Sequence, residues 1–235
     1  MSQPFAYRDG PVALLGEIVG PVGPANGRAI LVVHEADGIG GNVRRSCTRL
    51  AALGYAAAAA DLHGDGRVLA DDEIGPAMAR FKAEPALLRR RVRAAFDALL
   101  AETGLAADRV AAIGYCFGGL AVLELARSGA ALSAVASFHG LLTTAAPAGP
   151  GDIAARVLAC TGALDPLVPP ADVATFQAEM TGAAADWQLI VYGRALHSFT
   201  NVDVDGLGDP RMAYDEAADR QSWAALVAFL DAAFA

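Results

Sequence analysis

Short apolar runs alternate with longer amphipathic segments along most of the chain. Four runs are short, continuous and apolar, which is typical of strands buried on both faces of a parallel sheet: residues 29–33, 55–60, 110–113 and 157–160. Residues 132–138 and 187–192 are two further predicted strands. Apolar residues recur at helical spacing between them, at about residues 43–53, 85–102, 118–127, 172–180 and 215–234. This alternation predicts an α/β fold with a mostly parallel central sheet and helices on both faces.

Two segments need separate interpretation. Residues 12–19 precede the alternation and lie between the turn sequences RDG and GPVG, so we expect an antiparallel edge strand or a hairpin. The alanine run 56–60 favours a helix by propensity, but it continues into Asp61 without a cap, so we predict a tightly packed central strand. There is no internal repeat, low-complexity linker or charge block in the sequence, and we therefore expect one domain over residues 1–235.

Composition narrows the classes of partner. The chain has 235 residues, 54% of them hydrophobic, and 18 basic against 26 acidic side chains give a formal charge of −8. Such an acidic protein is a poor match for nucleic acid or an anionic membrane. The first residues lack a signal-peptide pattern and no apolar run reaches the roughly 18 residues of a membrane span, so we expect a cytoplasmic protein. Three cysteines without metal-ligand spacing indicate reduced thiols.

One cysteine stands where a predicted strand turns into a helix, in the sequence IGYCFGGLAVLELA. A nucleophile at such a turn needs small neighbours, which Gly114 and Gly118 supply, and the helix amino end favours a thiolate at Cys116. The N–H of Phe117 is a candidate donor to an oxyanion. This pattern is the nucleophile elbow of α/β-hydrolases with Cys in place of Ser. The alternative is an inert buried thiol between ordinary turn glycines.

Chain order selects the partners of this cysteine. In the α/β-hydrolase pattern an acid and then a histidine follow the nucleophile, and His197 is the one histidine of four that comes late enough. Asp165, in the sequence GALDPLVP, follows the intervening strand and is the best candidate acid. His197 would move the proton while Asp165 fixes its tautomer. The alternatives are a turn-forming aspartate before proline and a surface histidine.

The chain resembles the dienelactone hydrolase family over nearly its whole length. The resemblance is carried by the segments ILVVHEADG, GYAAAAADLHGDG, IGYCFGGLAVLELA, ASFHG, GALDPLVP and LHSFTNVDVDG. It implies an α/β-hydrolase fold and a triad of Cys116, His197 and Asp165. It also implies that Glu35 interacts with the resting thiol and that the N–H of Ala36 completes the oxyanion hole. Glu35 could otherwise be a solvated residue at a strand end.

The resemblance implies a hydrolase of a small ester, lactone or thioester, which we expect to work through a thioacyl-enzyme. No ligand set stands at metal spacing, so we expect no metal or cofactor, and we expect a monomer or homodimer. Family members that hydrolyse dienelactone hold its carboxylate with arginines, and Asn201 stands at one of these positions. Arg80 lies in the region of another, and His139 is a further candidate at the pocket. Arg194 and Lys82 are available cations that are otherwise solvated charges. The competing hypothesis is a non-catalytic protein that keeps the fold to bind a small molecule or partner.

Overall fold

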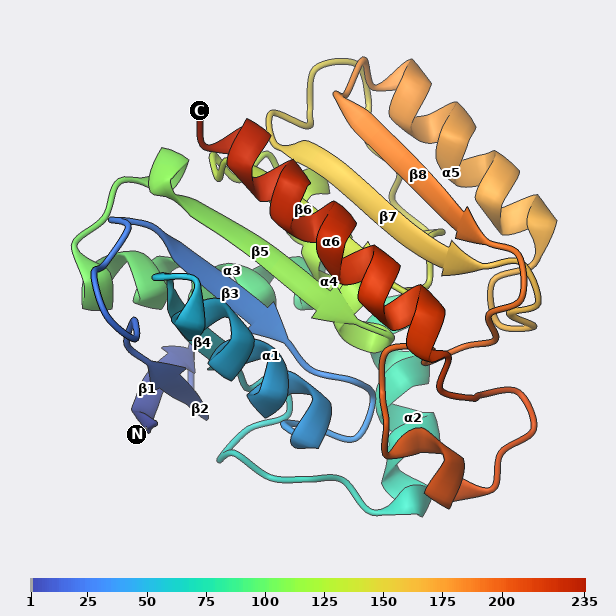
Figure 1. Ribbon diagram of the computed structural model, residues 1–235, viewed down its shortest axis with the longest axis horizontal. Coiled ribbons are helices and arrows are strands. Elements are labelled where there is room, and N and C mark those ends of the chain that lie inside the picture. Colours follow the sequence, from blue (N-terminus) through green and yellow to red (C-terminus); the bar gives the residue numbers. More distant parts are fainter. Residues whose placement is uncertain (1) are drawn as a thin grey trace.

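The computed structural model describes residues 2–235 and contains one eight-stranded sheet, ordered β1-β2-β4-β3-β5-β6-β7-β8 (Figure 1). β1 and β2 pair with each other antiparallel, β2 pairs antiparallel with β4, and the remaining pairs are parallel. The strands are β1 (Gln3–Asp9), β2 (Val12–Val19), β3 (Ala29–Val33), β4 (Ala56–Ala60), β5 (Val110–Tyr115), β6 (Ala134–Phe138), β7 (Arg156–Gly162) and β8 (Trp187–Tyr192).

Helices cover both faces of this sheet, so the predicted α/β architecture is confirmed. They are α1 (Gly41–Ala52), α2 (Asp71–Ala83), α3 (Pro85–Thr103), α4 (Phe117–Arg127), α5 (Pro170–Gly182) and α6 (Glu216–Ala233). Short 3₁₀ turns occupy Ala107–Arg109 and Val204–Leu207. In Figure 1, α1 and α6 lie in front of the sheet, and α3 and α4 lie behind it. Among residues 2–235, no helix is long and apolar enough to cross a membrane.

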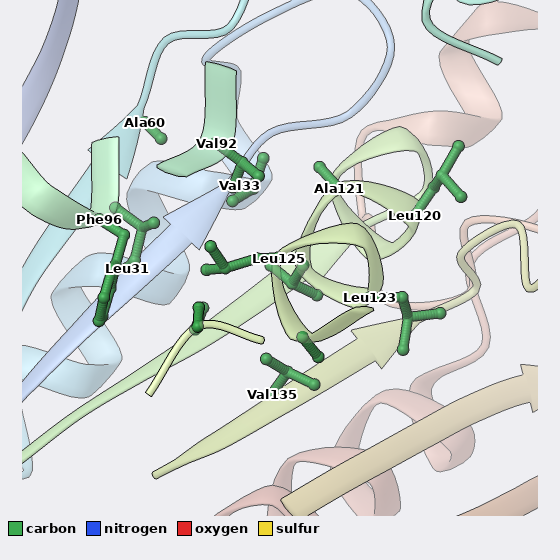
Figure 2. Packing of buried hydrophobic residues seen from close by; sticks show 14 of the residues in the cluster. Leu31, Val33, Ala60, Val92, Phe96, Leu120, Ala121, Leu123, Leu125 and Val135 are labelled. Atoms are coloured by element: carbon green, nitrogen blue, oxygen red, sulfur yellow. The ribbon is translucent and has the colours of Figure 1, made fainter. Parts of the chain in front are cut away.

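Two apolar cores form because neighbouring strand residues point to opposite faces of the sheet. Leu31 and Val33 of β3 pack on the face covered by α3 and α4, whereas Ile30 and Val32 pack on the face covered by α1 and α6. Figure 2 shows side chains of α4 packed over β3 on the first of these faces. Every residue of α4 is buried, so this helix is fixed in position at the centre of the molecule.

The structure resolves the two segments that needed separate interpretation. Residues 12–19 form the inner strand of a hairpin, and the edge strand is β1. The alanine run is strand β4, since four of its five residues are buried between β2 and β3, where small side chains suit close packing. Residues 71–83, for which no element was predicted, form α2, which is separated from the predicted helix α3 by Glu84 before Pro85.

The parallel strands end at one edge of the sheet, where ligands bind in open α/β sheets. Glu35 follows β3, Cys116 follows β5 and His139 follows β6. Asp165 follows β7 and His197 follows β8. The fold therefore brings all the predicted triad residues and Glu35 to the same edge.

Candidate active site

Cys116 occupies a strained turn between β5 and α4. Its φ of 53° and ψ of −114° lie in a region that residues with a side chain rarely adopt. A Cβ on Gly114 would come within 2.0 Å of the Gly118 carbonyl oxygen, and a Cβ on Gly118 within 2.2 Å of the Val33 oxygen. The glycines on either side of Cys116 are thus required by backbone contacts, as the sequence predicts.

His139 helps to hold this turn from below. The Cys116 N–H donates to the Phe138 carbonyl at 3.0 Å and to Nδ1 of His139 at 3.1 Å. Since a backbone N–H can only donate, Nδ1 carries no proton, and Nε2 donates to Oγ1 of Thr200 at 2.8 Å. Burial and the nearby charge of His197 hold the pKa of His139 well below its usual value. His139 is fully buried under the elbow and does not line the cavity.

His197 and Asp165 form a buried pair. Nδ1 of His197 lies 2.8 Å from Oδ2 of Asp165, and neither side chain is exposed. Oδ1 of Asp165 accepts from the Leu167 N–H at 2.8 Å, which fixes the carboxylate. The alternatives of a surface histidine and of an aspartate that only forms a turn are therefore wrong.

The other nitrogen of His197, Nε2, lies on the side of the ring that interacts with Cys116, whose charge acts on the imidazole. Nε2 is buried and makes no hydrogen bond of ordinary length within residues 2–235. Burial opposes a charged imidazolium, but the nearby charge of Cys116 and the hydrogen bond to Asp165 raise the pKa of His197 to about 10. A neutral or charged imidazole beside a thiol or thiolate is the arrangement needed for proton transfer.

Glu35 points into the site rather than into solvent. Its carboxylate accepts from Nδ2 of Asn201 at 3.0 and 3.3 Å, and more weakly from Nδ2 of Asn42 at 3.5 Å. Burial raises the pKa of Glu35 to about 7, and the neighbouring Asp37 carboxylate adds to this rise. The alternative of a solvated strand-end residue is wrong. Both Glu35 and Cys116 line one cavity, but the Glu35 oxygens bond to the amides and not to the thiol.

The cavity over Cys116 has a volume of about 350 Å³. Its lining is mostly apolar, with three carboxylates and no Arg, Lys or His. The lining residues are Glu35, Ala36, Asp37, Val68, Leu69, Asp71, Ile74, Cys116, Ser198, Asn201, Val204, Leu207 and Met212. A ligand in this space would meet apolar walls and negative charge.

The predicted substrate-binding residues separate in the structure. Asn201 lines the cavity, whereas Arg80 lines a neighbouring cavity and pairs with Glu84 at 3.4 Å. Lys82 lies at a third cavity, and Arg194 is exposed beyond β8. Asn201 instead contacts Arg45, whose Nη2 donates to the Asn201 Oδ1 at 3.3 Å.

Several residues at the site were not predicted. Arg45 is also paired with Asp203 at 2.8 Å, and Asn42 and Thr200 bond to each other at 3.3 Å. Asn42 and Arg45 lie on α1, and no local motif in the sequence connects this helix to residues 200–203. Within residues 2–235, no group of three or more His, Cys, Asp or Glu is arranged to hold a metal ion.

The remaining cysteines lie in the apolar core on the α1 and α6 face of the sheet. Burial raises the pKa of Cys47 and of Cys160 to about 12, so both thiols stay protonated near neutral pH. Neither Cys47 nor Cys160 is hydrogen-bonded to His197 or Asp165. Both are therefore poor candidates for a nucleophile.

Known proteins share the fold of this chain. The family model described as "Dienelactone hydrolase family" matches residues 14–234. The chain belongs to this family and is a hydrolase of the class that acts on carboxylic esters.

Among solved structures, the chain is similar to the protein m3DLH, with 40% identity, a TM-score of 0.93 and coverage of 100% of this chain and 99% of that one. It is also similar to a dienelactone hydrolase-like promiscuous phosphotriesterase from metagenomic libraries, with 37% identity, a TM-score of 0.90 and the same coverage. A protein of Escherichia coli O157:H7 with the provisional name carboxymethylenebutenolidase is 30% identical over 208 residues, which are 83% of this chain and 73% of that one.

Proposed function

We propose that this protein hydrolyses small uncharged esters, lactones or thioesters through a triad of Cys116, His197 and Asp165. The observation that carries the proposal is the buried His197 imidazole, bonded to Asp165 through Nδ1 and with an unpartnered Nε2 beside Cys116. A binding protein would need none of these three groups in this relation. Hydrolysis needs all of them.

The first half of the reaction forms a thioester. The proton of the Cys116 thiol moves to Nε2 of His197, and the sulfur attacks the carbonyl carbon of the substrate. The carbonyl oxygen becomes an oxyanion that accepts hydrogen bonds from the N–H groups of Phe117 and Ala36. Neither N–H has a hydrogen-bond acceptor among residues 2–235, so both are available. The carbon–oxygen bond to the leaving group then breaks, and the leaving alkoxide takes the proton from His197.

The second half releases the acid. Nε2 of His197 takes a proton from a water molecule as its oxygen attacks the thioester carbon. The tetrahedral intermediate collapses, the carbon–sulfur bond breaks, and the sulfur recovers the proton from His197. Asp165 keeps Nδ1 protonated in both halves and stabilises the imidazolium.

Glu35 is proposed to act on the resting thiol. An ionised carboxylate near Cys116 opposes loss of the thiol proton, while the amino end of α4 favours it. With a pKa of about 7, Glu35 changes charge within the range of neutral pH. The Glu35 carboxylate is held by the neutral amide of Asn201 and not by a charged guanidinium.

The lining of the cavity supports uncharged substrates. Glu35, Asp37 and Asp71 are acidic, and the other side chains in contact with the space are apolar or neutral. A substrate carboxylate would gain no charge-assisted hydrogen bond from an Arg or Lys of this lining. A free carboxylate close to the scissile bond should therefore reduce turnover.

A panel of p-nitrophenyl esters, extended by one neutral phosphotriester, tests the proposal with and without iodoacetamide. We expect ester turnover that iodoacetamide abolishes and that Cys116→Ala reduces to below about a tenth, since loss of a nucleophile removes the covalent route. Cys47→Ala and Cys160→Ala are matched controls and should stay active. A tenth or more of the activity in Cys116→Ala would exclude Cys116 as the nucleophile. Binding without turnover of any ester would favour the non-catalytic alternative.

A further inference from the structure

His34 lies directly behind the loop that carries Ala36. It follows β3, and its side chain is fully buried. Both of its ring nitrogens are hydrogen-bonded to backbone groups: Nε2 lies 3.1 Å from the Leu62 nitrogen, and Nδ1 lies 2.5 Å from the Glu35 carbonyl oxygen. The mechanism above uses neither the ring nor its bonds.

The two partners fix where the proton of His34 sits. The Leu62 N–H can only donate, so Nε2 must be the bare nitrogen that accepts. The neutral ring then carries its proton on Nδ1, which donates to the Glu35 carbonyl. Burial lowers the pKa of His34, which keeps this neutral form at neutral pH.

The Glu35 carbonyl and the Ala36 N–H are the two ends of one peptide group. No cis peptide bond occurs among residues 2–235, so this carbonyl and this N–H point in opposite directions. A donor on the carbonyl oxygen therefore fixes the plane of the peptide without competing for the N–H. It also draws electron density toward the oxygen and makes the N–H a stronger donor.

We infer that His34 is a positioning residue that orients and polarises the Ala36 N–H for the oxyanion. The inference rests on the proposed function, in which Ala36 supplies one of two oxyanion donors. The Gly38 N–H shares the Glu35 oxygen at 3.4 Å, a longer contact that closes the turn. His34 makes the shorter of the two bonds and is the main support of this peptide.

His63 supports the next peptide along. Its Nε2 lies 3.0 Å from the Ala36 carbonyl oxygen, and its ring stacks on Phe117 at a centroid distance of 6.0 Å and an angle of 10°. Its ring is also 4.7 Å from that of His34. The rings of His34 and His63 thus connect Ala36 to Phe117, the two residues whose N–H groups are proposed to bind the oxyanion.

Two variants test the donor Nδ1 and the acceptor Nε2 of the His34 ring separately. His34→Asn places an amide N–H where Nδ1 was and can still donate to the Glu35 carbonyl, but it gives nothing to the Leu62 N–H. His34→Gln places an amide oxygen near the position of Nε2 and can still accept from Leu62, but it leaves the Glu35 carbonyl without its side-chain donor. Both remove the ring, so they share its loss of packing and serve as controls for each other.

The measurements are kcat, KM and the ¹H chemical shift of the Ala36 amide in each variant. We expect His34→Gln to lower kcat about tenfold or more with little change in KM, because the oxyanion forms only in the transition state. We expect His34→Asn to keep kcat within about threefold. The Ala36 amide proton should move upfield in His34→Gln and stay near its position in His34→Asn.

Equal losses in kcat for the two variants, or an unmoved Ala36 amide in His34→Gln, would overturn the inference and leave His34 a packing residue. If His34→Gln does not fold, a loss above about tenfold in folded His34→Asn would overturn it as well. An inactive wild-type protein would defeat the proposed function. The amide shift would still decide, in that case, whether His34 polarises this peptide.

Discussion

The two N–H groups proposed to bind the oxyanion are held in different ways. In the elbow segment, residues 114–119, the Cys116 carbonyl that shares a peptide with the Phe117 N–H accepts from Gly119 at 3.0 Å and Leu120 at 3.4 Å. These donors belong to the first turn of α4. In the β3 loop, residues 34–38, the equivalent carbonyl of Glu35 is held by the His34 ring, which depends in turn on Leu62 after β4.

This difference separates local from tertiary support. The Cys116 carbonyl is held by N–H groups of the helix turn that follows it directly in the chain, although the elbow segment also contacts Val33 and His139. In the β3 loop, the next helix begins only at Gly41, so no helical turn can hold the Glu35 carbonyl. The buried side chain of His34 holds it instead. A preorganised site can therefore use backbone on one side and a fixed neutral imidazole on the other.

The largest effect is expected at His197. Both segments donate N–H groups to the oxyanion, and the oxyanion forms only when His197 takes the proton of Cys116. His197→Ala should lower kcat by about a thousandfold or more, and Asp165→Asn should be damaging but leave more activity, since triad members act as a unit. Steady-state kinetics on one p-nitrophenyl ester decides the order. Undiminished activity in His197→Ala would assign the base to another group, and His139, with its ring centroid 5.4 Å from that of His197, is the nearest candidate.

Gly118→Ala should break the contact between the two segments. Its Cβ would lie 2.2 Å from the Val33 oxygen and 2.6 Å from the His34 oxygen, and both atoms are backbone. We expect a loss of about 3 kcal/mol or more in the free energy of unfolding. Gly182→Ala is the matched control, since nothing lies within 4 Å of its Cβ. Denaturant unfolding of both variants measures the difference, and equal stabilities would show that the segments tolerate separation.

Glu35→Gln tests the electrostatics of the β3 loop. The pKa of Glu35 is raised from 4.5 to about 7 in the folded protein, so the folded state keeps a proton that the unfolded state has lost. Stability should therefore fall as pH rises from about 4.5 to 7, by about 2 to 3 kcal/mol relative to Glu35→Gln. The two proteins should match below pH 4.5.

Unfolding free energies across this pH range, with the exposed Glu102→Gln as control, measure the effect. Parallel pH profiles for wild type and Glu35→Gln would mean that the Glu35 carboxyl titrates normally. The Asn201 hydrogen bonds would then outweigh burial.

The smallest effect concerns the charge of the substrate at Asn201, which contacts the β3 loop through Glu35. Asn201→Arg should shift preference by about tenfold toward an ester with a free carboxylate, because a charge-assisted hydrogen bond is worth roughly 1.5 to 3 kcal/mol. The measurement is kcat/KM for a matched pair, the free carboxylate and its methyl ester. Arg80→Ala is the control, since Arg80 lines another cavity. A clear preference of the unmodified protein for the anion would mean that another cation, such as Arg45, holds it.

Sequence patterns predicted the elements whose signals are local. The order of strands and helices, the turn at Cys116 and the pairing of His197 with Asp165 follow from periodicity, glycine spacing and chain order. The alanine strand β4 was also predictable because a helix there would have lacked a cap. The strand pair at the amino end was left between two alternatives, since one apolar segment does not reveal its partner.

The rest of the site depends on contacts between distant residues. No local pattern reports that Leu62 donates to His34, that Arg45 reaches Asn201, or that the Asp71–Ala83 helix carries Arg80 away from Cys116. These contacts join residues that are far apart in sequence, and they form because the loops pack over the same edge of the sheet. His139 was expected at the pocket, whereas it is fully buried beneath the elbow, where its ring accepts from the Cys116 N–H.

The most direct test of covalent catalysis by Cys116 is the capture of its acyl-enzyme. The wild-type protein is mixed with a p-nitrophenyl ester, quenched in acid within the first turnover and analysed by peptide mass spectrometry. We predict a burst of p-nitrophenol close to one equivalent per chain and an acyl group on the peptide that contains Cys116. A burst with the acyl group on another residue, or steady turnover with no acylated peptide in a quenched series, would contradict the mechanism.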